Sequence, residues 1–205
     1  LQENSQNLTG VNVIVEPTRV YHQGTLASHI IGYASRITQK NLEQFEAEGD
    51  THEYEVDDKV GQTGIEKVFE NYLRGEDGIK QIDMSVDGTV TGEYTSQEAI
   101  GGANVALTID ANLQRIAEDS LERNIIKIRE GGFGESYEAK TGAVVVTNVN
   151  TGEILAMASY PDYEVGLFYD GISSQKYNEY QEAGAFYNRA AQGTYPPGSI
   201  YKMIT

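Results

Sequence analysis

The chain has 205 residues, 39% of them hydrophobic and 22% charged, which is the composition of a globular protein with one ordinary domain or two small ones. Its formal net charge of −16 argues against a nucleic-acid partner, because phosphate binding needs basic patches. The absence of cysteine excludes disulfides, thiolate metal sites and a cysteine nucleophile. The first residue is Leu1 rather than Met, so we expect any leader or membrane anchor to lie upstream of this sequence.

The first hundred residues predict short elements. In chain order we expect a strand within 11–21 that Pro17 ends, a helix over 39–48, a helix over 63–73 that stops near Gly75, and a hairpin over 80–94 that turns at Asp87-Gly88. Thr63 and Glu66 have the spacing of a capping box at the start of the third element. The sequence EAIGGA at 98–103 indicates a domain boundary.

The second half predicts longer elements. We expect a strand and then a long helix within 104–128 with Asp110 as its N-cap, a hairpin over 142–161 that turns at Asn150-Thr151-Gly152, an irregular tyrosine-rich stretch over 162–195, and a new helix opened by Ser199. The run Ala143–Val146 is apolar on both faces, which predicts a buried central strand. The tyrosines of 160–187 either pack on the domain surface, which we favour, or form a wall of a substrate groove.

Two Ser-x-x-Lys sequences occur, at Ser173 with Lys176 and at Ser199 with Lys202. This spacing suits nucleophilic catalysis because positions i and i+3 of a helix share a face. A serine in the first helical turn meets free backbone N–H groups and the positive end of the helix dipole, which favour the oxyanion of acyl transfer. A buried lysine can be neutral and accept the serine proton. So short a pattern also arises by chance, and its surroundings must separate the two matches.

The surroundings favour Ser199 over Ser173. Residues 196–198, Pro-Pro-Gly, place a sharp turn just before Ser199, and the apolar residues within 200–204 offer cover for Lys202. Ser173 instead lies in polar sequence, where helix capping explains it. On local sequence alone, Ser199 is either a helix cap or a nucleophile.

Longer stretches of the chain carry a resemblance that decides between these interpretations. The stretches are HIIGYAS (29–35), VGQTGIEKVFENYLRGEDG (60–78), ANVALTIDANLQRIAEDSLE (103–122), TGAVVVTNVNTGEILAMASYPDY (141–163) and NRAAQGTYPPGSIYK (188–202). Together they resemble the class B penicillin-binding proteins, the peptidoglycan D,D-transpeptidases of the bacterial cell envelope, whose superfamily signature includes Ser-x-x-Lys. The resemblance covers about residues 29–205 in register.

The resemblance implies an α+β fold in two parts. An elongated pedestal, also called the dimerisation domain, would occupy about residues 1–101 and be incomplete at its N-terminus. The beginning of the transpeptidase domain, an antiparallel sheet with helices, would occupy about 102–205 and be truncated at its C-terminus. By the same resemblance, Ser199 is the nucleophile that attacks D-Ala-D-Ala stem peptides and Lys202 is the general base. The acyl-serine then passes to an amine of a neighbouring stem peptide, and β-lactams trap the same serine.

The departures from the family pattern matter equally. No Ser-x-Asn and no Lys-Thr-Gly follows Ser199 in this sequence. In the family these motifs relay protons, bind the substrate carboxylate and complete the oxyanion hole. We therefore expect an N-terminal fragment that is inactive by itself, in which Ser199 and Lys202 are present without the rest of the site.

The resemblance also implies partners and a location. The partners are peptidoglycan stem peptides, β-lactam antibiotics and a polytopic membrane glycosyltransferase that touches the pedestal, with self-association left open. No cofactor, metal or nucleic acid is expected. The location is the extracytoplasmic face of the plasma membrane in a bacterial envelope, held by an N-terminal helix that this chain lacks. Elongation and division roles both remain open.

Other polar residues have structural interpretations. His22, His29 and His52 lack the spacing of a metal site, and the resemblance makes His29 part of a pedestal motif. Asn188 and Arg189 either line the cleft or hold their loop by hydrogen bonds, and we favour the second.

Alternative functions stay open at this point. The chain could be a non-catalytic interaction or scaffold module of the cell-wall machinery. Water as acyl acceptor would make the enzyme a carboxypeptidase. The pedestal motifs argue against a penicillin-sensing receptor or a β-lactamase.

Overall fold

The computed structural model describes residues 18–49, 54–55, 57–86 and 90–203, so the strand expected within 11–21 lies almost wholly outside the described residues. In chain order the elements are α1 Ser28–Ile31, β1 Ala34–Arg36, α2 Gln39–Glu48, β2 Lys59–Gly61, α3 Gly64–Val68, α4 Glu70–Leu73, β3 Ile79–Met84, β4 Val90–Gln97, α5 Ala111–Arg129, β5 Gly142–Thr147, β6 Ile154–Tyr160, the 3-10 helix η2 Val165–Phe168, α6 Ser174–Ala183, α7 Arg189–Gln192 and the 3-10 helix η3 Gly198–Met203. The described strands pair as three separate antiparallel sheets, β1–β2, β3–β4 and β5–β6, which confirms the α+β prediction. Within these ranges no helix combines the length and the apolar character that a bilayer crossing requires.

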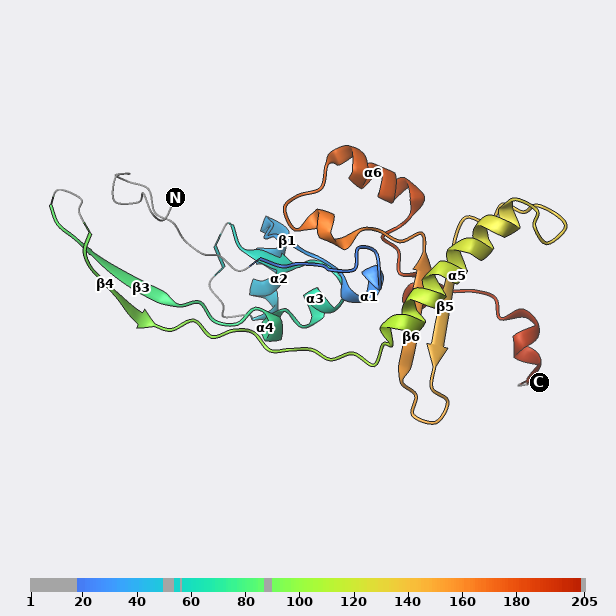
Figure 1. The fold of residues 1–205 in the computed structure, drawn as a ribbon, viewed down its shortest axis with the longest axis horizontal. Coiled ribbons are helices and arrows are strands. Elements are labelled where there is room, and N and C mark those ends of the chain that lie inside the picture. The colour runs from blue at the N-terminus through green and yellow to red at the C-terminus, as the bar shows by residue number, and fades with distance from the viewer. Residues whose placement is uncertain (1–17, 50–53, 56, 87–89, 204–205) are drawn as a thin grey trace.

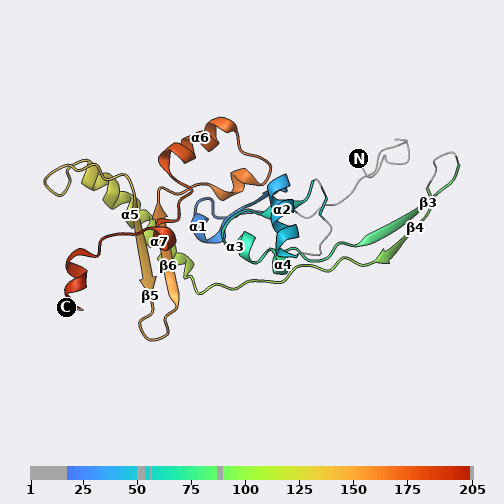
Figure 2. The same cartoon turned by 180° about the vertical axis from the view of Figure 1, so that it is seen from behind.

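The elements are spread along one long axis (Figures 1 and 2). The β3–β4 hairpin projects as an arm at one end, and the small elements from α1 to α4 lie in the middle. At the other end, α5 lies against the β5–β6 hairpin. The segment with η2 and α6 returns from this hairpin to lie beside the middle part, so residues far apart in sequence meet there.

Helix α2 has the bounds that the sequence predicts, because its first turn is closed from both sides. The backbone N–H of Asn41 donates to Thr38 Oγ1 at 3.3 Å, and the backbone N–H of Thr38 donates to Asn41 Oδ1 at 3.0 Å. Gly49 then ends the helix in the left-handed conformation, with a φ of 74°. Local signals are sufficient for this element.

The single helix predicted over 63–73 is wrong, because the chain forms α3 and α4 with a break at Phe69. The predicted capping box is absent as well, since the Thr63 side chain makes no capping hydrogen bond. The Glu66 side chain turns inward instead, where Glu66 Oε1 accepts from Arg19 Nε at 3.1 Å and from the Tyr21 hydroxyl at 3.2 Å. These partners lie far upstream, so the local pattern does not reveal them.

The predicted hairpin of β3 and β4 is confirmed, while its Asp87-Gly88 turn lies outside the described residues. Every residue of β3 is exposed, so the apolar alternation of this strand does not face a core.

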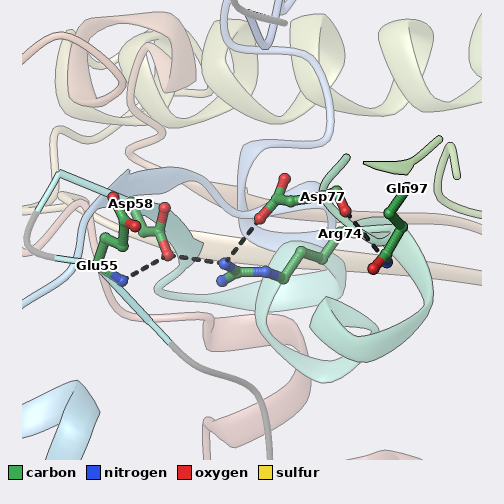
Figure 3. A network of polar contacts seen from close by, with 5 residues as sticks. All are labelled: Glu55, Asp58, Arg74, Asp77 and Gln97. Atoms are coloured by element: carbon green, nitrogen blue, oxygen red, sulfur yellow. Dashed lines mark hydrogen bonds and ion pairs between the residues drawn. The ribbon is translucent and has the colours of Figure 1, made fainter. Parts of the chain in front are cut away.

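A polar network holds the base of this arm (Figure 3). Arg74 forms an ion pair with Asp58 at 2.7 Å and lies 3.8 Å from a carboxylate oxygen of Asp77. Asp58 also accepts from the backbone N–H of Glu55 at 2.9 Å, and the Gln97 side chain donates to the Asp77 carbonyl at 3.4 Å. The network joins the loop before β2 to the two places where the chain enters and leaves the arm, at Asp77 and Gln97.

Asp110 caps α5 as predicted. Its Oδ1 accepts from the backbone N–H groups of Asn112 and Leu113, both at 2.9 Å. The apolar stripe of α5 then faces β6, where Ala156 is fully buried.

The strand predicted before α5 is wrong, because side chains rather than a backbone ladder cover the outer edge of β6. The hydroxyl of Thr108 donates to the Ile154 carbonyl at 2.7 Å. The buried side chain of Gln114 accepts from the Met157 N–H at 2.7 Å and donates to the Met157 carbonyl at 2.9 Å. Gln114 thus takes the place that a neighbouring strand would fill.

The prediction of a buried central strand at Ala143–Val146 is also wrong for the described sheet. Strand β5 pairs only with β6 among the described strands, and Val145 is 48% exposed. The buried positions belong to β6, at Ala156 and Ala158, because α5 covers that strand more completely. Periodicity identified the strand but not how many neighbours it has.

Aromatic side chains form a core between the two halves of the chain. Tyr163 and Phe168 are buried, and Tyr33 from the first half packs against them. The Tyr33 and Phe168 rings stack with centroids 4.0 Å apart, and the His29 ring meets the Tyr163 ring edge-on at 5.3 Å. We call this set the junction core. These aromatic residues pack inward between the halves rather than on the domain surface.

Candidate active site

Ser199 and Lys202 lie in η3, which forms where the sequence predicts a helix opened by Ser199. Because side chains three residues apart eclipse one another in a 3-10 helix, both project from the same side of this turn. Both side chains are exposed, and neither makes a hydrogen bond or ion pair with another described residue. In Figure 1 this turn lies at the red C-terminal end, beyond the β5–β6 hairpin.

The approach to Ser199 is built by glycines at two places. Gly198 has a φ of 56°, so the sharp turn expected after the two prolines does require glycine. At Gly193, an added Cβ would come within 2.4 Å of the Arg189 carbonyl oxygen and 2.5 Å of the Tyr195 ring. The segment between α7 and η3 therefore follows a defined path up to Tyr195.

Asn188 and Arg189 hold the start of that path, as the favoured interpretation of the sequence predicts. Asn188 Oδ1 accepts from the Ala191 N–H at 3.1 Å and caps α7. The Arg189 side chain is buried and donates to the carbonyls of Gly184 at 2.8 Å and Tyr187 at 3.2 Å. The structure does not bring either residue into contact with Ser199.

A cavity of about 380 Å³ opens between β5 and the segment that leads to Ser199. It is lined by Ala143, Val145, Arg189, Ala190, Gly193 and Tyr195. Most of the lining side chains are small or apolar. The single cationic lining residue, Arg189, donates hydrogen bonds to two backbone carbonyls. The cavity lies beside the segment that leads to the candidate nucleophile, and its lining contains no carboxylate and no lysine.

The competing Ser-x-x-Lys match is a helix cap, as predicted. Ser173 Oγ accepts from the Lys176 backbone N–H at 3.3 Å and so caps α6. The Lys176 side chain points outward and pairs with Glu179 at 2.8 Å. Helix capping thus accounts for Ser173, and Lys176 pairs with Glu179 rather than with the serine.

The chain also contains the letters of the two other superfamily motifs, but ahead of Ser199. Lys140-Thr141-Gly142 leads into β5, with the exposed Lys140 amine 3.8 Å from Glu138. Ser5-Gln6-Asn7 lies outside the described residues. Chain order separates both from the signature, in which these motifs follow the serine. A motif search that ignores order would assign them wrongly.

The described histidines are His22 and His29. Among the described residues, no group of three or more His, Asp or Glu side chains could hold a metal ion, and His52 lies outside those residues. His29 Nε2 donates to the Ala185 carbonyl at 2.6 Å. Burial lowers the pKa of His29, and the nearby charge of Arg189 lowers it further. His29 is a half-buried residue of the junction core.

Comparison with known families identifies the chain. Residues 1–107 match the model described as the penicillin-binding protein dimerisation domain, and residues 142–205 match the penicillin-binding protein transpeptidase domain. The chain belongs to the class B penicillin-binding proteins.

Curated relatives of this class B penicillin-binding protein are named peptidoglycan D,D-transpeptidase MrdA. The Escherichia coli K12 protein is 32% identical over 201 residues, which are 97% of this chain and 29% of the relative. The Haemophilus influenzae protein is 33% identical over 186 residues, which are 90% of this chain and 26% of the relative. The chain thus spans less than a third of the curated relatives that it matches.

Solved structures give the same result. One chain of a peptidoglycan synthase complex, studied for the coordination of polymerization and crosslinking, matches with a TM-score of 0.67 and 31% identity over 83% of this chain and 29% of that chain. Pseudomonas aeruginosa PBP2 in complex with WCK 5153 matches with a TM-score of 0.61 and 31% identity over 90% of this chain and 33% of that chain. Helicobacter pylori PBP2 in complex with MreC matches with a TM-score of 0.61 and 29% identity over 91% and 31%.

Proposed function

We propose that this chain provides the pedestal and the serine-bearing start of a peptidoglycan D,D-transpeptidase. The observation that carries the proposal is the placement of Ser199 and Lys202 on one side of η3, directly after the left-handed turn at Gly198. This turn lies within the residues that match the transpeptidase domain. Relatives of the chain are named peptidoglycan D,D-transpeptidases.

The reaction proceeds through an acyl-serine. Lys202 takes the hydroxyl proton of Ser199 while Ser199 Oγ attacks the carbonyl carbon of the penultimate D-Ala. The C–N bond breaks, and the terminal D-Ala leaves with that proton. An amine of a neighbouring stem peptide then attacks the ester, which forms the cross-link and restores the serine hydroxyl. A β-lactam opens its ring on the same Ser199 oxygen and remains attached.

The isolated chain is inactive in this proposal. A lysine acts as a base near neutral pH only when surrounding groups desolvate it, whereas the Lys202 side chain is exposed here. The Ser199 side chain is exposed too, and no side chain in the described part of the chain forms a hydrogen bond with it. Residues encoded after Thr205, including a Ser-x-Asn and a Lys-Thr-Gly motif, would enclose the pair.

The proposed division of labour follows the two family matches. In this proposal the pedestal comprises about residues 1–101 and the transpeptidase portion about 102–205, whereas the dimerisation-domain match extends to residue 107 and the transpeptidase match begins at residue 142. The pedestal contacts a polytopic glycosyltransferase at the extracytoplasmic face of the plasma membrane, and stem peptides bind near Ser199. Matching structures of a peptidoglycan synthase complex and of a PBP2–MreC complex support a role within an assembly.

A fluorescent penicillin tests the proposal. The protein that continues past Thr205 is expected to be labelled, and S199A to be unlabelled. K202A is expected to be labelled far more slowly, whereas the matched variants S173A and K176A of the α6 cap keep the full rate. Labelling of S199A, or equal rates for K202A and K176A, would refute the assignment. Labelling of the 205-residue chain itself would refute the predicted inactivity.

Two alternatives have their own outcomes. A non-catalytic scaffold module is supported by the exposure of Ser199 and by the solvent-exposed arm of β3 and β4. An early stop codon after Thr205 would establish it and exclude the enzyme. A carboxypeptidase would release D-Ala at the same rate with and without an amine acceptor, whereas a transpeptidase forms a cross-linked product only when the amine is present.

A further inference from the structure

We propose that Asn188 is a positioning residue for Ser199, which it serves by tying the segment that leads to the nucleophile to the backbone of the pedestal. This inference rests on the proposed function, because it treats Ser199 as the reacting residue. The observation behind it is a single side-chain amide that contacts three separate parts of the fold.

The oxygen of the Asn188 amide faces the transpeptidase portion. Asn188 Oδ1 accepts from the Ala191 N–H at 3.1 Å and from the Ser159 hydroxyl at 3.3 Å. Ser159 Oγ in turn accepts from the Ala190 N–H at 3.0 Å. Ser159 belongs to β6 and is buried, so the first turn of α7 is bound to the sheet through this pair. A backbone N–H can only donate, and the contact with Ala191 therefore fixes which end of the amide is oxygen.

The nitrogen of the same amide faces the pedestal. Asn188 Nδ2 donates to the carbonyl of His29 at 3.4 Å, across 159 residues of sequence. At 3.4 Å this hydrogen bond is long, so its contribution to holding Asn188 depends on how rigidly the His29 carbonyl is fixed. The acceptor lies in α1, a helix of the pedestal that contacts β6 of the transpeptidase portion.

Three other contacts fix α1 in place. The Ala27 N–H donates to Glu118 Oε1 at 2.8 Å, and Ala27 is the non-glycine residue with a positive φ, 55°, in the described backbone. The Tyr163 hydroxyl donates to the Ser28 carbonyl at 3.1 Å. The His29 ring donates to the Ala185 carbonyl at 2.6 Å. The His29 carbonyl is therefore presented to Asn188 by a turn that is bound on three sides.

The segment beyond α7 can transmit this anchoring to Ser199. The Gly193 N–H donates to the Arg189 carbonyl at 3.1 Å, and the Tyr187 hydroxyl donates to the Gln192 carbonyl at 2.7 Å. The next residues include Pro196 and Pro197, whose fixed φ angles leave the chain little freedom before the turn at Gly198. A shift of α7 is thus carried to the nucleophile rather than absorbed on the way.

Helix capping alone would explain only part of this arrangement. A cap requires the oxygen of residue 188 and nothing from its nitrogen. Aspartate is an equally good cap and keeps both acceptor contacts, but it cannot donate to a carbonyl. The substitution Asn188→Asp therefore separates capping from the link to the pedestal, while Asn188→Ala removes both.

The decisive experiment measures acylation in the protein that includes this chain and its downstream catalytic sequence. The acylation rate at saturating fluorescent penicillin and the concentration for half-maximal rate are determined separately. For N188D we expect a rate about 2- to 13-fold lower, the loss that one hydrogen bond of about 0.5–1.5 kcal/mol corresponds to. The half-saturating concentration should stay unchanged, and the melting temperature should fall less than in N188A. N188A should lose both rate and stability.

The matched control is Asn148→Asp. Asn148 Oδ1 accepts from the Asn150 N–H at 3.0 Å in the β5–β6 turn, so the variant makes the same chemical change at a capping asparagine with no pedestal contact. N148D should acylate at the wild-type rate. An unchanged rate for N188D, or an equal loss of rate in N148D, would overturn the inference.

A second measurement does not depend on activity. In the 205-residue chain, amide hydrogen exchange at residues 190–193 should be faster in N188D than in wild type and unchanged in N148D. Absence of labelling in the wild-type enzyme would refute the proposed function, and the exchange result would then still decide whether Asn188 anchors this segment to the pedestal. Equal exchange in N188D and wild type would refute the anchoring.

Discussion

The Tyr163 side chain tests whether the two halves of the chain share one core. Its ring is 3% exposed and lies edge-on to His29, Tyr33 and Phe168, with centroid distances of 5.3, 6.2 and 5.7 Å. Its hydroxyl donates to the Ser28 carbonyl at 3.1 Å, which links the second half of the chain to α1. Burial raises the pKa of this hydroxyl, so it remains protonated and available as a donor at neutral pH.

Two substitutions divide the contribution of Tyr163 into ring and hydroxyl. Tyr163→Ala removes a buried aromatic ring, which costs about 3–5 kcal/mol of unfolding free energy in well-packed cores. Tyr163→Phe keeps the ring and removes the hydroxyl, which bonds the Ser28 carbonyl and the Thr63 side chain. The Ser28 carbonyl keeps a second donor, the Gly32 N–H at 2.9 Å, so it is not left unpaired. We therefore expect a loss of about 1 kcal/mol, near the low end for a buried polar group.

Denaturant unfolding followed by circular dichroism measures these losses, and hydrogen exchange shows where they fall. Tyr137→Phe is the matched control, because Tyr137 is 61% exposed and its hydroxyl bonds Glu135 at 3.1 Å on the surface. In Y163A, protection should fall both at residues 28–36 and at 163–168. If protection falls only at 163–168, the halves are independent and the shared core is refuted. If Y163F equals Y137F, the link between the hydroxyl and Ser28 contributes nothing.

Two further predictions concern a backbone contact and pH. Gly32→Ala should lower the free energy of unfolding of the pedestal by several kcal/mol in thermal unfolding. Gly32 has a φ of 72°, which strains any residue with a Cβ, and the added Cβ would also lie 1.9 Å from the Thr63 carbonyl oxygen. Gly49→Ala, with a φ of 74° and nothing within 4 Å, should cost only about 1–2 kcal/mol, and equal losses would contradict the steric argument. For His29, the stability of wild type relative to His29→Gln should fall as the pH drops below about 6.5, and a flat difference would contradict the buried site.

The features that the sequence predicts correctly are those with local causes. Helix α2, the Asp110 cap and the Ser173 cap each depend on side chains within three residues of the capped backbone. The hairpin of β5 and β6 is local in the same sense, because its turn chemistry and its two apolar runs are adjacent in sequence.

The errors have distant causes. Glu66 fits a capping box by spacing, yet its carboxylate serves Arg19 and Tyr21 instead. The run before α5 is β-prone, but the Gln114 side chain occupies the strand edge that it would have paired with. The exposure of Val145 depends on how many strands flank β5, which no periodicity encodes.

The candidate site shows the same division. The helix that carries Ser199 and Lys202 is a local prediction, because the turn at Gly198 and the 3-10 helix that follows are adjacent in sequence. The role of Asn188 could not, since its nitrogen reaches His29 across 159 residues. An asparagine before a short helix indicates a cap and nothing more.

Protonation of His29 lowers the folding stability, whereas protonation of the nearby buried carboxyl groups raises it. The His29 test therefore compares wild type with His29→Gln. Burial lowers the pKa of His29, so the unfolded chain binds the proton more readily and stability falls with falling pH, from about 6.5 down through the folded pKa. Burial raises the pKa of Glu118, which accepts from the Ala27 N–H, and likewise that of Asp162. For these carboxyl groups the folded state binds the proton more readily, so stability rises as the pH falls through their folded pKa values. As the pH falls, the folded state therefore loses stability through His29 from about pH 6.5 downward and gains stability through the carboxyl groups at more acidic pH. The difference in stability between wild type and His29→Gln isolates the contribution of the histidine.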